Sequence, residues 1–165
     1  MIAPTIQKYL TDNNISYDLV PHQRTLSSLR TAEACHIPGD RLAKGVMLRD
    51  HGSHRRYWLA VVPASRQLRL GDLGMQLGQD VELASEHEIE QVFADCDRGA
   101  VPAAGACYGL EVIVDDELAR QGELYFEGGD HATLVHMNRD EFARLNAAAR
   151  HGSFTAPAHE QRATM

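Results

Sequence analysis

Apolar side chains recur every three to four residues in several stretches of this chain, which is the spacing of one face of a helix. The first such stretch covers residues 2–13 and ends at Asn13-Asn14. Ser85 and Glu88 have the spacing of a capping box, and Asn138 is another candidate N-cap. Helices are therefore predicted at 2–13, from the candidate caps at 25–28 to about 36, at 72–77, at 85–93, near Glu117 and at 139–149.

Shorter runs rich in Val, Ile, Leu and aromatic residues, bounded by turn-forming residues, predict strands. The runs at 42–49 and 57–62 flank a polar loop that contains Gly52, which predicts a hairpin. Because strands and helices alternate irregularly, we expect an α+β fold with a mixed, mostly antiparallel sheet rather than a doubly wound one. The predicted strands are 15–20, 42–49, 57–62, 81–84, 111–115, 123–127 and 132–137.

A chain of 165 residues has the usual length of one domain with a substantial core. Residues 151–165 contain Gly, Ser and two prolines and show no apolar periodicity, which is typical of a mobile segment. We therefore expect a single domain over residues 1–150, followed by a flexible C-terminal tail at 151–165.

The composition indicates a cytoplasmic protein. The chain has no apolar run of about 18 residues, so no membrane span is expected. Its first residues lack the basic and apolar regions of a signal peptide. The three cysteines, Cys35, Cys96 and Cys107, fit reduced thiols better than a disulfide framework.

The net charge of −7 argues against a nucleic-acid partner, but the charge is unevenly distributed. Residues 24–69 carry nine Arg or Lys and three Asp or Glu, whereas residues 70–145 carry four basic and 17 acidic residues. This pattern permits a basic face that binds a phosphate-bearing ligand. Alternatively, the two segments intermix in the folded chain and leave no patch.

Lys44 is an unusual residue in the strand predicted at 42–49. The chain has 14 arginines but only two lysines, Lys8 and Lys44. A compact, strongly hydrated ammonium group inside an apolar run costs solvation free energy unless an anion meets it. Lys44 is therefore a candidate for binding an anionic ligand; the alternative is a solvated side chain on an exposed strand face.

Three further segments are candidates for a site. The loop at 99–105 is bounded by glycines, so a ligand can approach its backbone N–H groups, although a plain connecting loop has the same composition. Asp130 and His131 follow a strand and two glycines, as in a site or a hairpin turn. Residues 22–28 are largely polar and precede a helix, which suits either an anion or a simple N-cap.

Familiar catalytic motifs are missing from the sequence, which contains no GxSxG elbow, P-loop or HExxH motif. His131 and His136 are five residues apart and lie on opposite faces of a strand, so they are a poor metal pair. We expect no metal and no other cofactor. Cys96 lies between Asp95 and Asp97, whose charge raises the pKa of its thiol, opposite to what a nucleophile needs.

Together these segments resemble the YbaK/ProX family of aminoacyl-tRNA deacylases, which includes the editing domain of prolyl-tRNA synthetases. The resemblance covers roughly residues 5–146. It is carried by Lys44 within Leu-Ala-Lys-Gly-Val-Met-Leu, the strand end Ala-Val-Val-Pro at 60–63, the loop 99–105, and the strand-glycine-strand-helix unit at 125–145.

The resemblance implies a barrel-like mixed sheet flanked by helices and a free-standing, cytoplasmic trans-editing hydrolase. Such an enzyme cleaves the ester between a small, wrongly attached amino acid and the tRNA 3′ end, with water attack assisted by the substrate. It implies aminoacylated tRNA as a partner, an aminoacyl-tRNA synthetase as a further candidate partner, and no membrane. The expected catalytic groups are Lys44 and the backbone of Gly99, Ala100 and Val101. The expected substrate-binding residues are His22, Thr25, Ser27, Gly45, Pro102, Gly105, Asp130 and His131.

One departure keeps an alternative open. In the family the loop proline often stands two residues before the final glycine, whereas Pro102 stands three residues before Gly105. The alternative function is a non-catalytic module that binds a nucleotide or aminoacyl ligand in the same pocket. Hydrolysis of an ester other than aminoacyl-tRNA is a third option.

Overall fold

The computed structural model describes residues 1–25, 27–52 and 56–158. The helices are α1 (Pro4–Asp12), α2 (Ser28–Ala34), α3 (Leu70–Leu77), α4 (Glu86–Val92), α5 (Asp116–Ala119) and α6 (Arg139–Leu145), with 3-10 turns η1 (Gly39–Arg41) and η2 (Gly105–Tyr108). The strands are β1 (Asp18–Pro21), β2 (Leu42–Asp50), β3 (Tyr57–Pro63), β4 (Arg66–Leu68), β5 (Val81–Leu83), β6 (Glu111–Asp115), β7 (Glu123–Glu127), β8 (Thr133–Asn138), β9 (Arg150–Gly152) and β10 (Thr155–Pro157).

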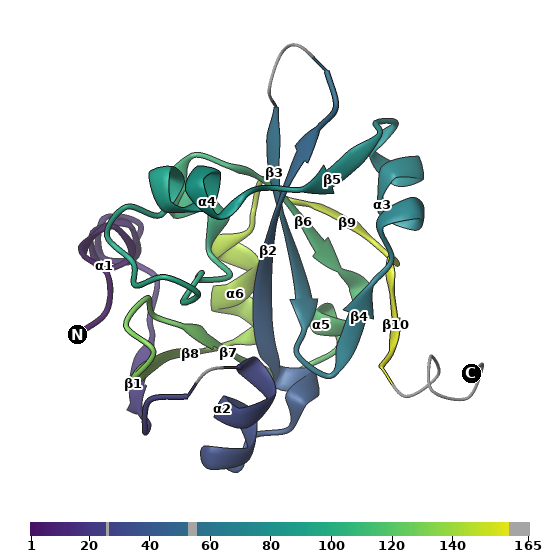
Figure 1. The fold of residues 1–165 in the computed structure, drawn as a ribbon. Helices are drawn as coiled ribbons and strands as arrows, with labels where there is room; N and C mark the ends of the chain where they lie inside the picture. The colour runs from purple at the N-terminus through teal and green to yellow at the C-terminus, as the bar shows by residue number, and fades with distance from the viewer. Residues whose placement is uncertain (26, 53–55, 159–165) are drawn as a thin grey trace.

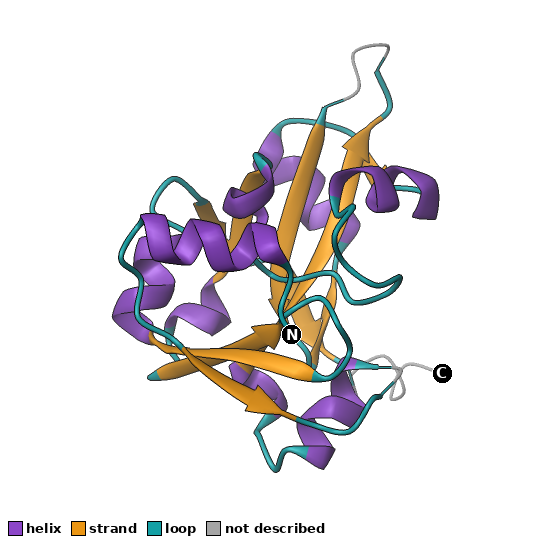
Figure 2. Cartoon of the chain, turned by 90° about the vertical axis from the view of Figure 1, so that its left-hand side faces the viewer, coloured by secondary structure: helices purple, strands orange, loops and turns teal. Residues whose placement is uncertain are grey.

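Eight of the described strands form one large sheet in the order β1-β8-β7-β2-β3-β6-β9, with β5 added to β2 (Figure 1). β4 and β10 form a second sheet of two strands. The hairpin predicted between 42–49 and 57–62 is confirmed, because β2 and β3 pair antiparallel. β7 and β8 also form an antiparallel hairpin, whereas β2 pairs with β7 in parallel. The helices pack around this sheet on more than one side (Figure 2). The predicted α+β class with a mixed, mostly antiparallel sheet is confirmed.

Strand β3 is buried on both faces and contributes to two of the three core clusters that the described residues form. Leu59 and Val61 contribute to the larger cluster, which also contains α1. Trp58, Ala60 and Val62 contribute to the smaller cluster, which also contains α3. This burial on both faces explains why the run at 57–63 is uniformly apolar rather than alternating. No helix in the described ranges is both long and apolar enough to cross a bilayer.

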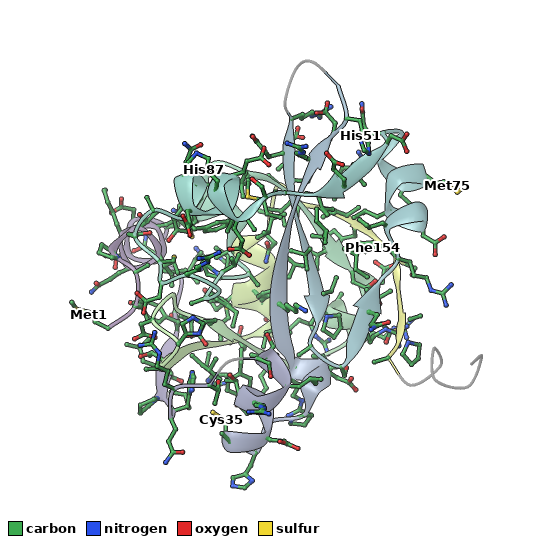
Figure 3. The ribbon with its side chains drawn as sticks, in the orientation of Figure 1. Met1, Cys35, His51, Met75, His87 and Phe154 are labelled. Carbon is green, nitrogen blue, oxygen red and sulfur yellow. The ribbon has the colours of Figure 1, made fainter. Side chains whose placement is uncertain are left out.

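The prediction of a mobile segment from residue 151 onward needs correction. β9 pairs with β6, β10 pairs with β4, and Phe154 between them is 1% exposed. Phe154 points inward from the yellow C-terminal segment (Figure 3). The buried carboxylate of Asp115 accepts hydrogen bonds from the Phe154 amide at 3.1 Å and the Thr155 hydroxyl at 3.0 Å, which holds the segment in place. Residues 159–165 lie outside the described part.

Other differences concern short elements and boundaries. The last helix ends at Leu145 rather than Ala149, and Asn146 is its C-cap. The predicted strand at 15–20 is β1, which begins only at Asp18 and includes Pro21. β4 and η2 were not predicted, because three or four residues carry too little periodicity to identify an element.

Replacing Phe154 tests whether the C-terminal segment belongs to the core. Phe154→Ala removes a fully buried aromatic ring, so we expect the free energy of unfolding to fall by about 3–5 kcal/mol. Urea denaturation measures this change, and His151→Ala on the exposed part of β9 is the control. A change below about 1 kcal/mol would mean that the segment does not contribute to the core.

The buried carboxylate of Glu88 makes stability depend on pH. The Tyr57 hydroxyl donates to it at 2.5 Å and the Ser85 amide at 2.9 Å, and these bonds lower its pKa from 4.5 to about 2. A lowered pKa stabilises the fold above the unfolded pKa, and that stabilisation disappears as the pH falls toward the folded value.

We therefore expect Glu88→Gln to lower the free energy of unfolding at pH 7 by about 1–3 kcal/mol. The difference from wild type should shrink between pH 4.5 and about 2. Urea titrations across this range measure it, with the exposed Glu90→Gln as control. A difference that stays constant with pH would contradict the assignment.

Candidate functional site

A cavity of about 120 Å³ is lined by residues from the first half of β2, α2, the loop after α4 and the β7–β8 hairpin. The ribbons of these elements can be followed in Figure 1. Its walls combine hydroxyl, amide, ammonium and carboxylate groups with apolar side chains. The lining residues are Thr25, Ser27, Ser28, Thr31, Leu42, Ala43, Lys44, Gly45, Gly99, Val101, Glu127, His131 and Leu134. Residues from all three segments predicted as sites, together with Lys44, therefore meet at one place.

Lys44 is exposed and borders this cavity. Its neighbours along the chain are paired: Arg41 lies 3.7 Å from Glu123, and Arg49 lies 2.6 Å from Glu82. Lys44 itself has no hydrogen-bond or ion-pair partner within the described residues. The ammonium group is thus available to an anion from outside the protein.

The uneven charge of the sequence does not produce two separate charged regions. Arg24 lies 3.8 Å from Asp97, and the pairs of Arg41 and Arg49 also join the basic segment to the acidic one. The two segments therefore intermix, as in the alternative reading of the charge pattern. What remains positive at the cavity is Lys44 rather than a broad basic patch.

Gly45 allows the loop after α4 to approach the sheet. A Cβ atom added at Gly45 would lie 3.0 Å from the carbonyl oxygen of Pro102 and 3.3 Å from a methyl group of Leu59. Only a residue without a side chain fits this contact without displacement. The fit places Pro102 behind the cavity wall, so it supports the loop and does not line the cavity.

The loop after α4 is also tied to the β7–β8 hairpin. The Asp97 amide donates to the Gly129 carbonyl at 2.7 Å, and Nε2 of His131 bonds to the Arg98 carbonyl at 2.6 Å. Because a carbonyl oxygen only accepts, Nε2 carries the proton, which leaves Nδ1 of a neutral His131 ring as an acceptor.

Three residues at this contact have a positive φ angle. Gly99 has φ +80° and Gly129 +105°, values that favour glycine. His131 has φ +60°, which is uncommon for a residue with a side chain and is found where the surroundings impose it. The contact between the loops thus holds the His131 ring at the cavity.

Two backbone donors in this loop are available. The Ala100 amide donates to the Asp97 carbonyl at 3.0 Å, and Ala100 is 1% exposed and does not line the cavity. Gly99 and Val101 do line it, and their amides have no acceptor in the described part of the chain. Of the three predicted residues, Gly99 and Val101 therefore lie at the cavity, whereas Ala100 lies outside it and its amide is paired.

Hydroxyl groups cover the side of the cavity formed by α2. Ser27 caps α2 by accepting a hydrogen bond from the Arg30 amide at 3.2 Å, so the simple N-cap interpretation is correct for this residue. The hydroxyls of Thr25 and Thr31 bond to each other. Ser28 and Thr31 were not among the predicted site residues, although helical spacing from Ser27 places Thr31 one turn further along.

Glu127 is a functional candidate that sequence reasoning missed. Burial is the main cause that raises the pKa of its carboxyl group, while nearby His22 acts in the opposite direction. Oε2 lies 3.4 Å from Nε2 of His22, whose side chain is 1% exposed. Oε1 is buried and has no hydrogen-bond partner among the described residues. The only sequence signal was its position just before two glycines.

Three other predicted residues lie outside the cavity. His22 lies behind Glu127, as described above. Gly105 packs in the core, where an added Cβ would lie 2.7 Å from Val112. Asp130 accepts hydrogen bonds from the amides of Ala132 at 2.9 Å and Thr133 at 2.8 Å, and it pairs with the N-terminal ammonium group. Asp130 therefore shapes the hairpin and does not line the cavity.

The described thiols and acidic groups show neither an activated nucleophile nor a metal site. Cys35, Cys96 and Cys107 are free, and the pKa of Cys96 is raised to about 11, mainly by burial and further by Asp95. The direction expected from the sequence is correct, but burial contributes more than the aspartates. In the ranges 1–25, 27–52 and 56–158, no three His, Cys, Asp or Glu residues are placed to hold a metal ion.

The sequence profile of the aminoacyl-tRNA editing domain matches residues 21–145 of this chain. A comparison of this chain with curated proteins found no match. Among solved structures, one described as a proposed trans-editing enzyme for prolyl-tRNA synthetase is 19% identical, with a TM-score of 0.80 and coverage of 94% of this chain and 99% of that chain.

Two further structures share the fold. A scaffold from a study of computational epitope grafting is 20% identical, with a TM-score of 0.80 over 93% of this chain and 97% of that chain. A protein from Marinobacter aquaeolei VT8, described as a proposed signal transduction protein, is 22% identical, with a TM-score of 0.73 over 94% of this chain and 31% of that chain. At these identities the likeness concerns the fold alone.

Replacing Gly45 tests the contact between β2 and the loop. Gly45→Ala places a methyl group 3.0 Å from the Pro102 carbonyl, so we expect the free energy of unfolding to fall by about 1–3 kcal/mol. Gly122→Ala is the control, because nothing lies within 4 Å of its added Cβ. Urea denaturation compares the two, and equal stability of both variants would contradict the close approach.

Proposed function

Because this chain belongs to the aminoacyl-tRNA editing domain family, we propose that it is a deacylase that hydrolyses mischarged aminoacyl-tRNA. The bond cleaved is the ester between a small amino acid and the 3′ end of the tRNA. The observation that carries this proposal is that Lys44, Gly99 and Val101 line one cavity, where the ammonium group and the two amides have no partner among the described residues.

The two donors suit the chemistry of ester hydrolysis. Attack of water on the ester carbonyl produces a tetrahedral intermediate with a negatively charged oxygen. Gly99 and Val101 line the cavity, and their amides have no acceptor in the described residues. They would stabilise that oxygen, and loss of one such donor costs about 10²–10³ in rate.

Lys44 suits the nucleotide end of the substrate. The terminal adenosine of tRNA carries a phosphate, and Lys44 borders the cavity without an ion-pair partner among the described residues. A fixed ammonium group would pair with that phosphate or hold the ribose end. The adjacent aspartates and burial raise the pKa of Cys96, so it is a poor nucleophile. Direct attack by water, assisted by a ribose hydroxyl, fits these groups better than an acyl-enzyme.

His131 suits the positioning of that water or hydroxyl. Nε2 of His131 donates a hydrogen bond to the Arg98 carbonyl, so Nδ1 of the neutral ring is the nitrogen that can accept one. His131 lines the cavity.

The cellular setting follows from the substrate. A deacylase for mischarged tRNA acts in the cytoplasm, in trans to the synthetase that made the error, and that synthetase is a candidate partner. The similarity in fold to a proposed trans-editing enzyme for prolyl-tRNA synthetase supports this setting.

The test is deacylation of a panel of mischarged tRNAs by wild type and Lys44→Ala. We expect hydrolysis of at least one tRNA that carries a small amino acid. Lys44→Ala should lower kcat/KM by about 10- to 100-fold, because a hydrogen bond to a charged group is lost. Lys8→Ala is the matched control, since Lys8 is the other lysine and pairs with Asp12 at 2.6 Å outside the cavity.

Two results would contradict the proposal. The first is no hydrolysis of any tRNA, and the second is a Lys44→Ala variant as active as Lys8→Ala. Stoichiometric binding of an aminoacyl ligand without turnover would instead support the alternative, a binding module that uses the same cavity.

A further inference from the structure

The cavity contains one carboxylate, on Glu127, among the described residues that line it. Its Oε1 atom is buried without a hydrogen-bond partner in the described residues, and an unsatisfied buried carboxylate oxygen costs free energy. Other acidic residues near it are occupied, since Asp130 bonds to Ala132, Thr133 and the N-terminus. Glu127 is therefore placed to receive a donor from a ligand.

His22 determines which oxygen of Glu127 is available. Nδ1 of His22 bonds to the Gln23 carbonyl at 2.6 Å, so Nδ1 carries a proton. Nε2 faces Oε2 of Glu127 at 3.4 Å, and two lone pairs would repel each other there. Oε2 therefore lies against the His22 ring, and Oε1 is the carboxylate oxygen that has no donor beside it among the described residues.

We infer that Glu127, positioned by His22, binds the α-ammonium group of the esterified amino acid. This inference rests on the proposed function and names the part of the substrate that the carboxylate recognises. An α-amino group has a pKa of about 8 and is mostly cationic at pH 7, so it supplies both a positive charge and N–H donors. A hydrogen-bonded pair of this kind satisfies the buried oxygen.

The charges of the cavity match those of an aminoacyl nucleotide. Lys44 supplies a positive group for the phosphate, and Glu127 supplies a negative group for the ammonium. The amides of Gly99 and Val101 line the same cavity, where the ester carbonyl would lie. A ligand without a free amino group, such as an N-acylated amino acid, would leave Oε1 unsatisfied and is expected to bind weakly.

The experiment measures binding of a non-hydrolysable, amide-linked aminoacyl-adenosine 5′-phosphate and of its N-acetyl derivative. For wild type, acetylation should weaken binding by about 10- to 100-fold, the effect of losing a charged hydrogen bond. For Glu127→Gln the two ligands should bind with similar affinity. The substitution removes the carboxylate, so acetylating the ligand's amino group has no further interaction to remove. Glu127→Asp keeps the charge and should retain part of the preference for the free amino group. This variant replaces Glu127→Gln in the test if the latter folds poorly.

Glu123→Gln is the matched control, because Glu123 lies on the same strand but does not line the cavity. It should keep the full preference for the free amino group. The inference is overturned if wild type does not distinguish the two ligands, or if Glu127→Gln keeps the preference. It is also overturned if Glu127→Gln weakens both ligands equally, as a general base or a structural residue would.

Hydrolysis assays on the same proteins separate this inference from the proposed function. If the wild-type protein deacylates tRNA but does not distinguish the acetylated ligand, the proposed function is supported and the inference about Glu127 is wrong. If it prefers the free amino group but deacylates no tRNA, the inference is supported and the proposed function is wrong.

Discussion

The site depends on the docking of one loop against β2 and the β7–β8 hairpin. The loop after α4 approaches Gly45 so closely that a methyl group would contact the Pro102 carbonyl at 3.0 Å. Hydrogen bonds from Asp97 to Gly129 and from His131 to Arg98 hold its other end. These contacts determine where the amides of Gly99 and Val101 lie relative to Lys44, so the proposed stabilisation of an oxyanion depends on backbone packing.

The cavity is lined by two side chains of opposite charge, Lys44 and Glu127. Arg41 and Arg49, at the two ends of β2, are paired with carboxylates, while Lys44 has no partner within the described part of the chain. Glu127 carries the opposite charge and is buried against His22. A positive and a negative group in one small cavity fit a substrate that has an anionic phosphate and a cationic amino group.

Sequence reasoning found the parts of this site that depend on rare residue choices. Lys44 stood out as one of two lysines, and Gly99 stood out because it bounds a loop of small residues. The availability of backbone donors could not be predicted, since only the fold shows that Ala100 bonds within its own turn. Glu127 was missed because neither its burial nor its contact with His22 leaves a signal in the sequence.

In the fold, too, features that depend on contacts between distant residues were not predicted. The long strands and capped helices were predicted from periodicity and capping residues, and most lie where expected. The C-terminal segment was misjudged because β9 and β10 have three residues each. Their place depends on one buried aromatic ring, Phe154, and on hydrogen bonds to Asp115, a residue about 40 positions away that periodicity does not reveal.

The most direct test of the account is a crystal structure of the protein with the amide-linked aminoacyl-adenosine 5′-phosphate bound. The account predicts the ligand carbonyl about 2.7–3.1 Å from the amides of Gly99 and Val101. It also predicts the phosphate beside Lys44 and the amino group at Oε1 of Glu127. A ligand bound outside this cavity, or with its carbonyl directed away from the loop amides, would contradict it.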